Sequence, residues 1–147
     1  MDAELLLADA LGTTRERLYS DPAASVEGAA VRAFQSHVRR RAVDREPVAY
    51  IVGRRAFRHL ELEVDRRVLI PRPETELLVE VALRLPSGAS VADVGTGSGA
   101  IALALADERP DLTVTGLELD PRALEVACAN GARLGLRVSF RRADLLD

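Results

Sequence analysis

The sequence predicts an α/β protein in which a small helical domain precedes the first part of a parallel sheet. The region from Asp2 to about Glu46 carries apolar residues at helical spacing, and residues 57–64 alternate between apolar and polar side chains. From Pro73 onward, helix and strand patterns succeed one another. We therefore expect a helical N-terminal domain over residues 1–48, a β-hairpin linker over residues 49–72 and an incomplete α/β domain over residues 73–147.

Three helices are expected in the N-terminal region. Asp2 can cap the first helix, and Thr13 with Glu16 has the spacing of a capping box that opens a second, short helix ending near Ser20. The third helix has to end before Pro47, which cannot continue it. Its apolar stripe consists of Val31, Phe34, Val38 and Ala42.

The alternating segment 57–64 predicts a half-buried strand. Gly53, followed by Arg54 and Arg55, is expected to form the turn that leads into this strand, so that the whole segment makes a hairpin. His59 lies on its polar side without a second ligand residue at a suitable spacing, so we expect no metal site.

The region after Pro73 predicts a βαβαβ succession and hence a parallel sheet. Pro73 can occupy the first turn of a helix that Pro86 stops. The apolar residues that follow Pro73 in this helix include Leu77, Leu78, Val81 and Leu85. The elements that follow are a strand (Ser90–Val94), a helix (Gly99 to about Arg109), a strand (Leu112–Leu117), a helix (Pro121 to about Leu134) and a strand (Arg137–Phe140).

Composition and charge set limits on function. The net charge of -3 gives no general reason to expect direct nucleic-acid binding, although the Arg39–Arg41 cluster is either a solvated basic face or a contact for an anionic partner such as RNA. The single cysteine, Cys128, suits a reducing compartment and is expected to be a buried, inert thiol, and Asn130 is interpreted as structural. The first residues, Met1-Asp2-Ala3-Glu4, have acids where a signal peptide would have bases, and the longest apolar run is far too short to span a bilayer. We therefore expect a cytoplasmic protein without membrane contact.

The most specific signal is the run Asp93-Val94-Gly95-Thr96-Gly97-Ser98-Gly99, which follows a strand and opens a helix. Gly95 permits a tight turn, Gly97 lets a ligand lie against the backbone, and Gly99 lets the helix pack closely on the sheet. Glu118 stands at the end of the next strand, where an acid can accept both hydroxyl groups of an adenosine ribose. This combination predicts a nucleoside-containing ligand.

The charges around the glycine loop favour one nucleoside over another. A carboxylate at Asp93 can reach the ammonium group of an amino-acid ligand, whereas it would repel a pyrophosphate. Glu118 and Asp120 make the same helix N-terminus more acidic still. S-adenosyl-L-methionine (AdoMet), which carries a sulfonium and an ammonium, suits this pattern better than a nicotinamide dinucleotide, although the run from Gly95 to Ala100 also satisfies the dinucleotide fingerprint. Asp144, after the third strand, either contacts the adenine or is an ordinary turn acid.

At this point the sequence resembles a known family, the HemK-type release factor glutamine methyltransferases, along its whole length. The glycine loop alone is shared by many methyltransferases, and the proline-containing segment that precedes it narrows the assignment. The segments that carry the resemblance are Pro47-Val48-Ala49-Tyr50-Ile51-Val52-Gly53, Ile70-Pro71-Arg72-Pro73-Glu74-Thr75-Glu76, Asp93 to Leu103, and Glu118-Leu119-Asp120-Pro121.

The resemblance implies a helical N-terminal domain for substrate recognition, a hairpin linker and a Rossmann-like AdoMet domain. It also implies methylation of the side-chain amide nitrogen of the glutamine in the Gly-Gly-Gln loop of peptide chain release factors. The implied cofactor contacts are Gly95, Thr96, Gly97, Ser98 and Gly99 for the methionine part, Glu118 for the ribose, Asp144 with Leu145 for the adenine, and Arg72 and Thr75 at the pocket mouth. Family members commonly have Asp where this chain has Glu118.

The chain departs from the family in one respect, because it contains no Asn-Pro-Pro-Tyr segment, which is the family's active site. An amide nitrogen is a poor nucleophile, and that segment would hold it in line with the methyl group. We therefore assign no catalytic residue, expect no activity from this chain alone and interpret it as part of a longer enzyme, with Ser90–Val94 as an unpaired apolar edge of the sheet. The alternatives are an NAD-linked dehydrogenase fragment and a non-catalytic module that binds release factors.

Overall fold

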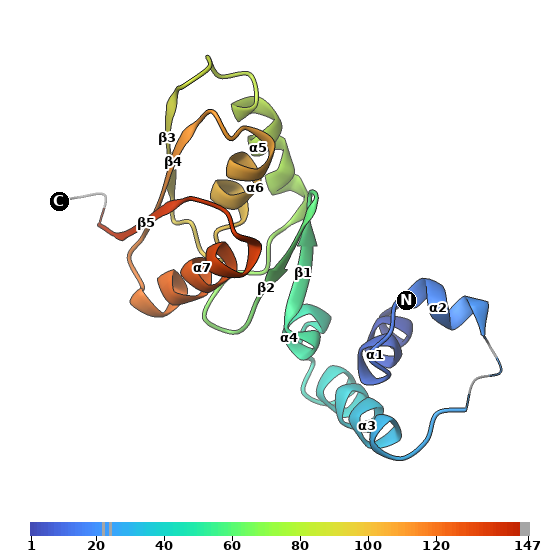
Figure 1. Ribbon diagram of the computed structural model, residues 1–147. Helices are drawn as coiled ribbons and strands as arrows, with labels where there is room; N and C mark the ends of the chain where they lie inside the picture. Colours follow the sequence, from blue (N-terminus) through green and yellow to red (C-terminus); the bar gives the residue numbers. More distant parts are fainter. Residues whose placement is uncertain (22, 24, 145–147) are drawn as a thin grey trace. The chain divides into compact units, whose positions relative to one another are not determined.

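The computed structural model describes residues 1–21, 23 and 25–144 (Figure 1). It divides into two compact units, Met1–Gly53 and Arg54–Asp147, each of which is considered by itself. In the described part of the chain, no helix is both long enough and apolar enough to cross a membrane.

In its described residues, the first unit contains helices joined by turns, as predicted, with one short helix more than predicted. Its helices are α1 (Asp2–Ala10), α2 (Arg15–Ser20), α3 (Ala29–Ala42) and α4 (Val48–Val52). The predicted caps are wrong by one residue: Met1 and Thr14 hold the N-cap positions, and neither makes a side-chain capping bond. The N–H of Thr13 donates to the carbonyl of Ala8 at 2.9 Å, so Thr13 belongs to the end of α1.

Two residues of the Arg39–Arg41 cluster form ion pairs within this unit. The Arg40 guanidinium contacts the buried carboxylate of Glu46 at 2.7 Å and also donates to two carbonyl groups of α4. Arg41 contacts Asp2 at 2.8 Å and thereby joins the end of α3 to the start of α1. Internal pairing therefore accounts for most of the basic cluster, which weakens its interpretation as an RNA contact.

The predicted hairpin is confirmed, but its turn lies elsewhere. Strands β1 (Arg54–Phe57) and β2 (Leu60–Glu63) pair in antiparallel fashion. The turn falls within the segment predicted as one continuous strand, because Arg58 adopts a left-handed conformation with a φ of 50°. Gly53 is also left-handed but ends helix α4. Phe57 and Leu62 are almost fully buried in the core of the second unit.

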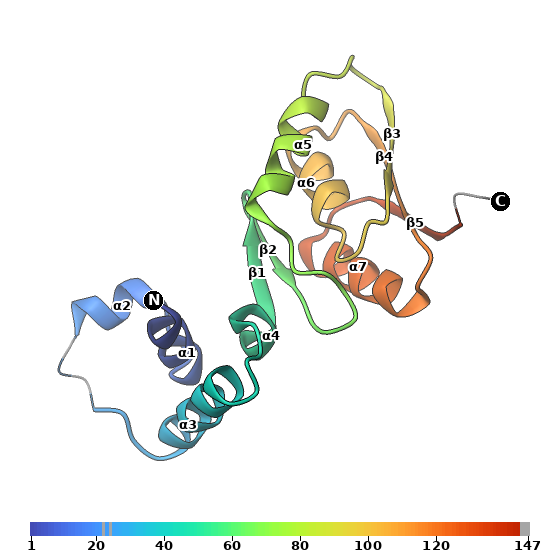
Figure 2. The same cartoon turned by 180° about the vertical axis from the view of Figure 1, so that it is seen from behind.

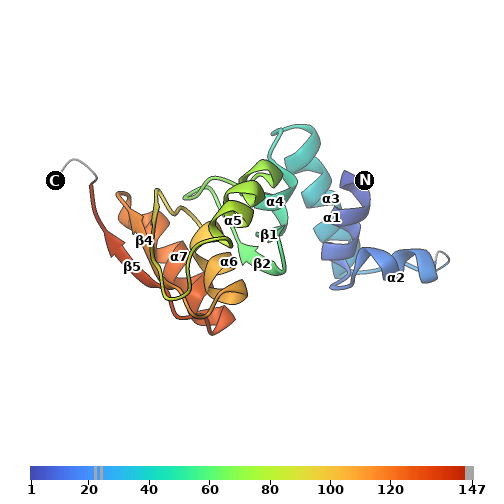
Figure 3. The same ribbon diagram turned by 90° about the horizontal axis from the view of Figure 1, so that it is seen from above.

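A three-stranded parallel sheet organises the second unit and confirms the predicted α/β class. Its strand order is β3-β4-β5, with Val94 at the end of β3 opposite Leu117 and with Glu118, the last residue of β4, opposite Arg142. The strands are β3 (Ser90–Val94), β4 (Thr113–Glu118) and β5 (Ser139–Arg142). Figures 1, 2 and 3 show the helices α5 (Glu76–Ala82), α6 (Ala100–Glu108) and α7 (Pro121–Leu134) along one side of this sheet.

The faces that α5 and α7 bury are made of other residues than those singled out in the sequence, and the burial predicted for Cys128 is wrong. The segment after Pro73 begins with the 3-10 helix η1 (Pro73–Thr75), and α5 then buries Val79. Leu77, Leu78, Val81 and Leu85 are all exposed. Cys128 is exposed as well, because α7 turns a neighbouring face inward, made of Ala123, Val126, Ala127, Asn130 and Gly131.

Candidate cofactor-binding site

The glycine loop, residues 95–99, leaves the carboxyl end of β3 and leads into α6. Its backbone is fixed from the side of the sheet, since the N–H groups of Gly95 and Thr96 both donate to the carbonyl of Leu117, at 2.9 and 3.0 Å. The loop closes on itself where the N–H of Gly99 donates to the carbonyl of Thr96 at 2.8 Å. The loop therefore has a defined shape before any ligand binds.

Gly97 and Gly99 have different surroundings in this loop. A Cβ atom at Gly99 would lie 2.9 Å from Leu103 and 3.2 Å from Phe140, so the missing side chain lets α6 approach the sheet. Gly99 is also left-handed, with a φ of 83°, at the N-cap of α6. A Cβ at Gly97 would meet only the carbonyl of Gly95, at 3.9 Å, so the backbone there faces open space that a ligand can occupy.

Asp93 places a buried carboxylate beneath the loop. Its Oδ2 accepts hydrogen bonds from Thr96 Oγ1 at 2.6 Å and from the N–H of Ala102 at 3.2 Å. Burial raises the pKa of the Asp93 carboxyl above its ordinary value, and the neighbouring Glu118 raises it further, whereas the two hydrogen bonds lower it. A cation brought into the pocket would relieve this electrostatic cost.

Glu118 binds the same loop from the end of β4. Its Oε2 accepts the N–H of Gly97 at 2.9 Å, while its Oε1 accepts the N–H groups of Leu119 and Asp120 at 3.0 and 3.2 Å. The backbone amide that an anionic ligand would seek at Gly97 is therefore already occupied by a carboxylate of the protein itself.

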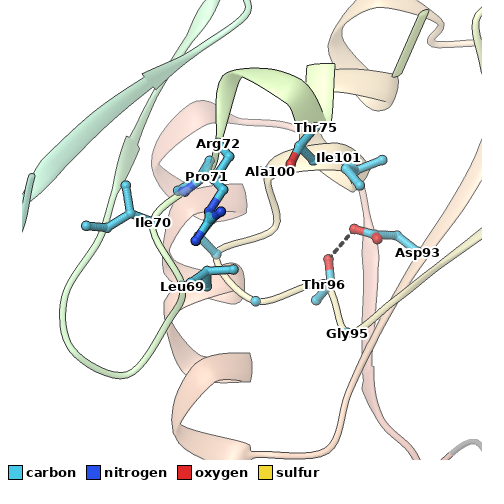
Figure 4. Close-up of a pocket in the computed structure, with 12 residues that line it drawn as sticks. Leu69, Ile70, Pro71, Arg72, Thr75, Asp93, Gly95, Thr96, Ala100 and Ile101 are labelled. Atoms are coloured by element: carbon cyan, nitrogen blue, oxygen red, sulfur yellow. Dashed lines mark hydrogen bonds between the residues drawn. The ribbon is translucent and has the colours of Figure 1, made fainter. Parts of the chain in front are cut away.

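A cavity of about 110 Å³ lies against the glycine loop. Figure 4 shows the segment containing Leu69 and Arg72 on one side of it, and Asp93 with Thr96 on the other. Its lining residues are Leu69, Ile70, Pro71, Arg72, Thr75, Asp93, Gly95, Thr96, Gly97, Ser98, Ala100 and Ile101. The walls are therefore apolar on the side of residues 69–71 and acidic at the base.

The structure brings most of the predicted site residues together. Those that line the cavity are Arg72, Thr75, Asp93, Gly95, Thr96, Gly97 and Ser98. Gly99 and Glu118 do not line it but adjoin it through the contacts described above. Asp144 is exposed and follows Ala143, whose N–H donates to the carbonyl of Glu118 at 3.2 Å, and Leu145 lies outside the described residues.

Sequence reasoning missed the apolar wall of the cavity. Leu69, Ile70 and Pro71 belong to or adjoin the proline-containing segment, from which only Arg72 and Thr75 were nominated. The sequence did contain an indication of this wall, because a short apolar run directly before a helix is expected to pack against another part of the protein. No periodicity indicated that it covers the glycine loop.

Two family models match separate parts of this chain. Residues 1–53 match the PrmC N-terminal domain, and residues 73–147 match the methyltransferase small domain. The release factor glutamine methyltransferase of Xylella fastidiosa (strain 9a5c) is 46% identical over 98% of this chain and 54% of its own length. The protein of the same name from Koribacter versatilis is 42% identical over 100% of this chain and 53% of its own length. The chain thus spans about half the length of the curated relatives it matches.

One solved structure supports the fold at a greater evolutionary distance. The tRNA (uracil-54, C5)-methyltransferase of Pyrococcus abyssi, in complex with S-adenosyl-L-homocysteine, superposes with a TM-score of 0.52 at 18% identity. The match covers 62% of this chain and 23% of the other. It supports the Rossmann-like arrangement of the α/β unit.

Proposed function

The chain belongs to the methyltransferase small domain family, and on this premise we propose that it is the AdoMet-binding part of a release factor glutamine methyltransferase. The single observation that carries the proposal is the acidic setting of the glycine loop. Asp93 and Glu118 both accept hydrogen bonds from backbone amides at the loop or in the first turn of α6, where a phosphate-binding protein would keep these amides for its ligand.

The residues present fit AdoMet. Gly97 offers uncovered backbone, and the carboxylate of Asp93 lines the cavity, where it can attract the ammonium group of a methionine moiety. Glu118 suits the ribose, because a carboxylate has about four acceptor positions. Its three amide partners leave capacity for a ribose hydroxyl. We propose that Thr96, Ser98 and Gly99 shape the methionine subsite, that Arg72 and Thr75 form its mouth, and that Asp144 with Leu145 borders the adenine.

The same contacts argue against the dinucleotide alternative. A pyrophosphate at this helix N-terminus would need the Gly97 N–H, which it could obtain only by displacing the carboxylate of Glu118. It would also lie beside the buried Asp93, whose ionised form is already disfavoured. A cationic ligand meets neither obstacle.

When bound, AdoMet supplies an electrophilic methyl group on its sulfonium. The contribution of the described residues is to bind and orient this group: the glycine loop fixes the position of the methionine part, and the cavity's apolar wall excludes water from one side. The chain has no Asn-Pro-Pro-Tyr segment, so nothing in it is assigned to position the acceptor amide.

For the substrate, we propose the glutamine side chain of a peptide chain release factor. The support comes from the relatives' names and from the match of residues 1–53 to the PrmC N-terminal domain. We further propose that the helical residues 1–48 recognise this protein substrate, that residues 49–72 link them to the AdoMet domain over residues 73–147, and that the enzyme acts in the cytoplasm without direct nucleic-acid binding.

Photochemical labelling tests the location of the cofactor. We expect ultraviolet irradiation with methyl-labelled AdoMet to attach label to a peptide that contains residues 93–101, and excess S-adenosylhomocysteine to prevent it. NADH at the same concentration should leave the labelling unchanged. Protection by NADH but not by S-adenosylhomocysteine would refute the proposed cofactor.

Mass spectrometry of a release factor tests the reaction. Incubated with AdoMet and this chain, the glutamine of the Gly-Gly-Gln peptide should keep its mass, because the residues that would hold its amide are absent from the sequence. Incubation with a full-length relative under the same conditions is the positive control. A methyl group added by this chain alone would show that the described residues complete an active site by other means.

A further inference from the structure

Asn130 lies in the middle of α7 with none of its surface exposed. Its Oδ1 accepts the N–H of Glu63 at 2.8 Å and Arg133 Nη2 at 3.2 Å. Its Nδ2 donates to the carbonyls of Glu63 and Ser98, both at 3.0 Å. Both hydrogens of the amide and its oxygen are therefore satisfied, as burial of a polar side chain requires.

These contacts join two segments far apart in the sequence. Glu63 is the last residue of strand β2, and Ser98 belongs to the glycine loop. The neighbouring Gly131 lets α7 pack closely against strand β5, since a Cβ at this position would lie 3.2 Å from the Phe140 ring. Only a short primary amide can donate to both carbonyls and accept from the Glu63 N–H at the same time, because aspartate lacks the donors and leucine lacks both functions.

The contact with Ser98 completes the fixation of the glycine loop. Gly95 and Thr96 are fixed through Leu117, and Gly97 is fixed through Glu118. The Ser98 carbonyl accepts from α7 instead, and its residue is only 2% exposed, so without Asn130 this acceptor would lose its side-chain partner away from water. That carbonyl belongs to the Ser98–Gly99 peptide unit, whose N–H donates to the carbonyl of Thr96 at 2.8 Å. Without Asn130 this peptide unit would be held from one side only, and its rotation would displace the backbone of the loop between Thr96 and Gly99.

We infer that Asn130 is a positioning residue for the cofactor: its side-chain amide holds the Ser98 peptide and thereby sets the backbone surface on which AdoMet lies. The inference rests on the proposed function for the identity of the ligand. It rests on the contacts alone for the role of Asn130 in shaping the loop.

The test compares Asn130→Ala with Arg133→Met in the whole chain. Arg133 also ties α7 to the hairpin, through the Glu61 carbonyl and the Glu63 carboxylate. It donates to Asn130 Oδ1 as well, but its removal leaves the bond from Asn130 Nδ2 to the Ser98 carbonyl in place. In the absence of ligand, amide hydrogen exchange at residues 97–100 should accelerate about tenfold in Asn130→Ala and stay unchanged in Arg133→Met. Calorimetry should show S-adenosylhomocysteine binding about tenfold more weakly to the first variant and less than about twofold more weakly to the second.

Equal exchange and equal affinity in the two variants would overturn the inference and leave Asn130 as a mere hairpin anchor. A wild-type chain without affinity for S-adenosylhomocysteine would contradict the proposed function, while the exchange comparison would still decide the role of Asn130. If Asn130→Ala does not fold, nuclear magnetic resonance of the wild type decides. The Nδ2 proton bound to the Ser98 carbonyl should shift on addition of S-adenosylhomocysteine more than the proton bound to the Glu63 carbonyl, and equal shifts would overturn the inference.

Discussion

The buried carboxylate of Asp93 links stability to ligand binding. Because burial raises its folded-state pKa above the unfolded value of 3.8, the folded state binds more protons than the unfolded state between these two values. The free energy of unfolding therefore falls as pH rises through this interval and stays lower above it. Asp93→Asn removes this decrease in the free energy of unfolding, because an amide does not ionise. The amide oxygen can still accept hydrogen bonds from Thr96 Oγ1 and from the N–H of Ala102.

We expect Asp93→Asn to gain stability relative to the wild type as pH rises from below 3.8 to neutral, as measured by urea unfolding at each pH. At neutral pH its affinity for AdoMet should fall about tenfold, because the ammonium group loses a charged partner. A stability difference independent of pH, or an unchanged affinity, would contradict the assigned role. Thr113→Val, on an exposed position of β4, provides a control outside the site.

A substitution at Gly116 tests how closely the sheet packs against the glycine loop. A Cβ at this position in β4 would lie 2.5 Å from the Phe140 ring and 3.0 Å from Thr96 Oγ1. Gly116→Ala should cost about 1–3 kcal/mol of unfolding free energy through overpacking, and Phe140→Leu in the same chain should recover part of the loss. Thermal unfolding monitored by circular dichroism measures both effects, and an unchanged midpoint in the single variant would show that the ring moves freely.

At the residue scale, the residues nominated from the sequence include most of the polar lining of the cavity and none of its apolar wall. The acids and glycines were nominated because their chemistry and spacing restrict what they can do. The apolar wall of Leu69, Ile70 and Pro71 was missed, because such side chains suit a core, a turn or a cavity equally well. Asn130 was interpreted as structural because one sequence cannot show that its amide reaches the Ser98 carbonyl.

At the scale of elements, Arg58 fastens the hairpin to the helices. Its largely buried guanidinium donates to both carboxylate oxygens of Glu108 on α6, at 2.9 Å for the Nη2 bond, and lies 3.4 Å from Glu80 on α5. The Arg58 guanidinium holds the pKa of the Glu108 carboxyl below its usual value of 4.5. The stability that this pair contributes is therefore present above 4.5 and is lost as pH falls through the lower folded-state pKa.

Arg58→Met keeps most of the length of the side chain and the same left-handed backbone but removes the charge. We expect it to lower the free energy of unfolding by about 2 kcal/mol at neutral pH and the difference from the wild type to shrink in acid. Glu80→Gln is the control, because Glu80 is 59% exposed and its loss should have little effect. A difference between Arg58→Met and the wild type that persists undiminished in acid would exclude the ion pair as its cause.

The sequence predicted the type of most elements but not every boundary. Strand β3 and helix α7 begin and end where expected, because glycine, proline and Asp120 mark their ends; the Asp120 side chain accepts the N–H of Arg122 at 2.9 Å. The hairpin turn was misplaced because a left-handed arginine has no local signal. The ion pair between Arg58 and Glu108 on α6, a contact distant in sequence, helps to hold the turn at this position.

For the whole molecule, the described residues leave apolar surface uncovered. Strand β3 is an edge of the three-stranded sheet, with Val94 46% exposed, and α5 exposes Leu77, Leu78 and Val81. An edge strand and an apolar helix face both favour association. The pattern of the sequence predicted the edge strand, but it did not predict that α5 exposes these apolar side chains.

We expect sedimentation velocity to show association that increases with protein concentration. Val81→Glu should reduce it by placing a charge on the α5 face, whereas Val43→Glu, at a residue 70% exposed in the helical unit, should leave it unchanged. A chain that stays monomeric at all concentrations, or one that responds equally to both substitutions, would show that α5 is not the associating surface.

The central claim is that the glycine loop, with its flanking carboxylates, binds a sulfonium nucleoside rather than a dinucleotide. Isothermal titration calorimetry of one protein sample with AdoMet and, separately, with NADH tests it most directly. The contacts of Asp93 and Glu118 predict saturable heat with AdoMet and none with NADH. Saturable binding of NADH together with no heat from AdoMet would contradict it.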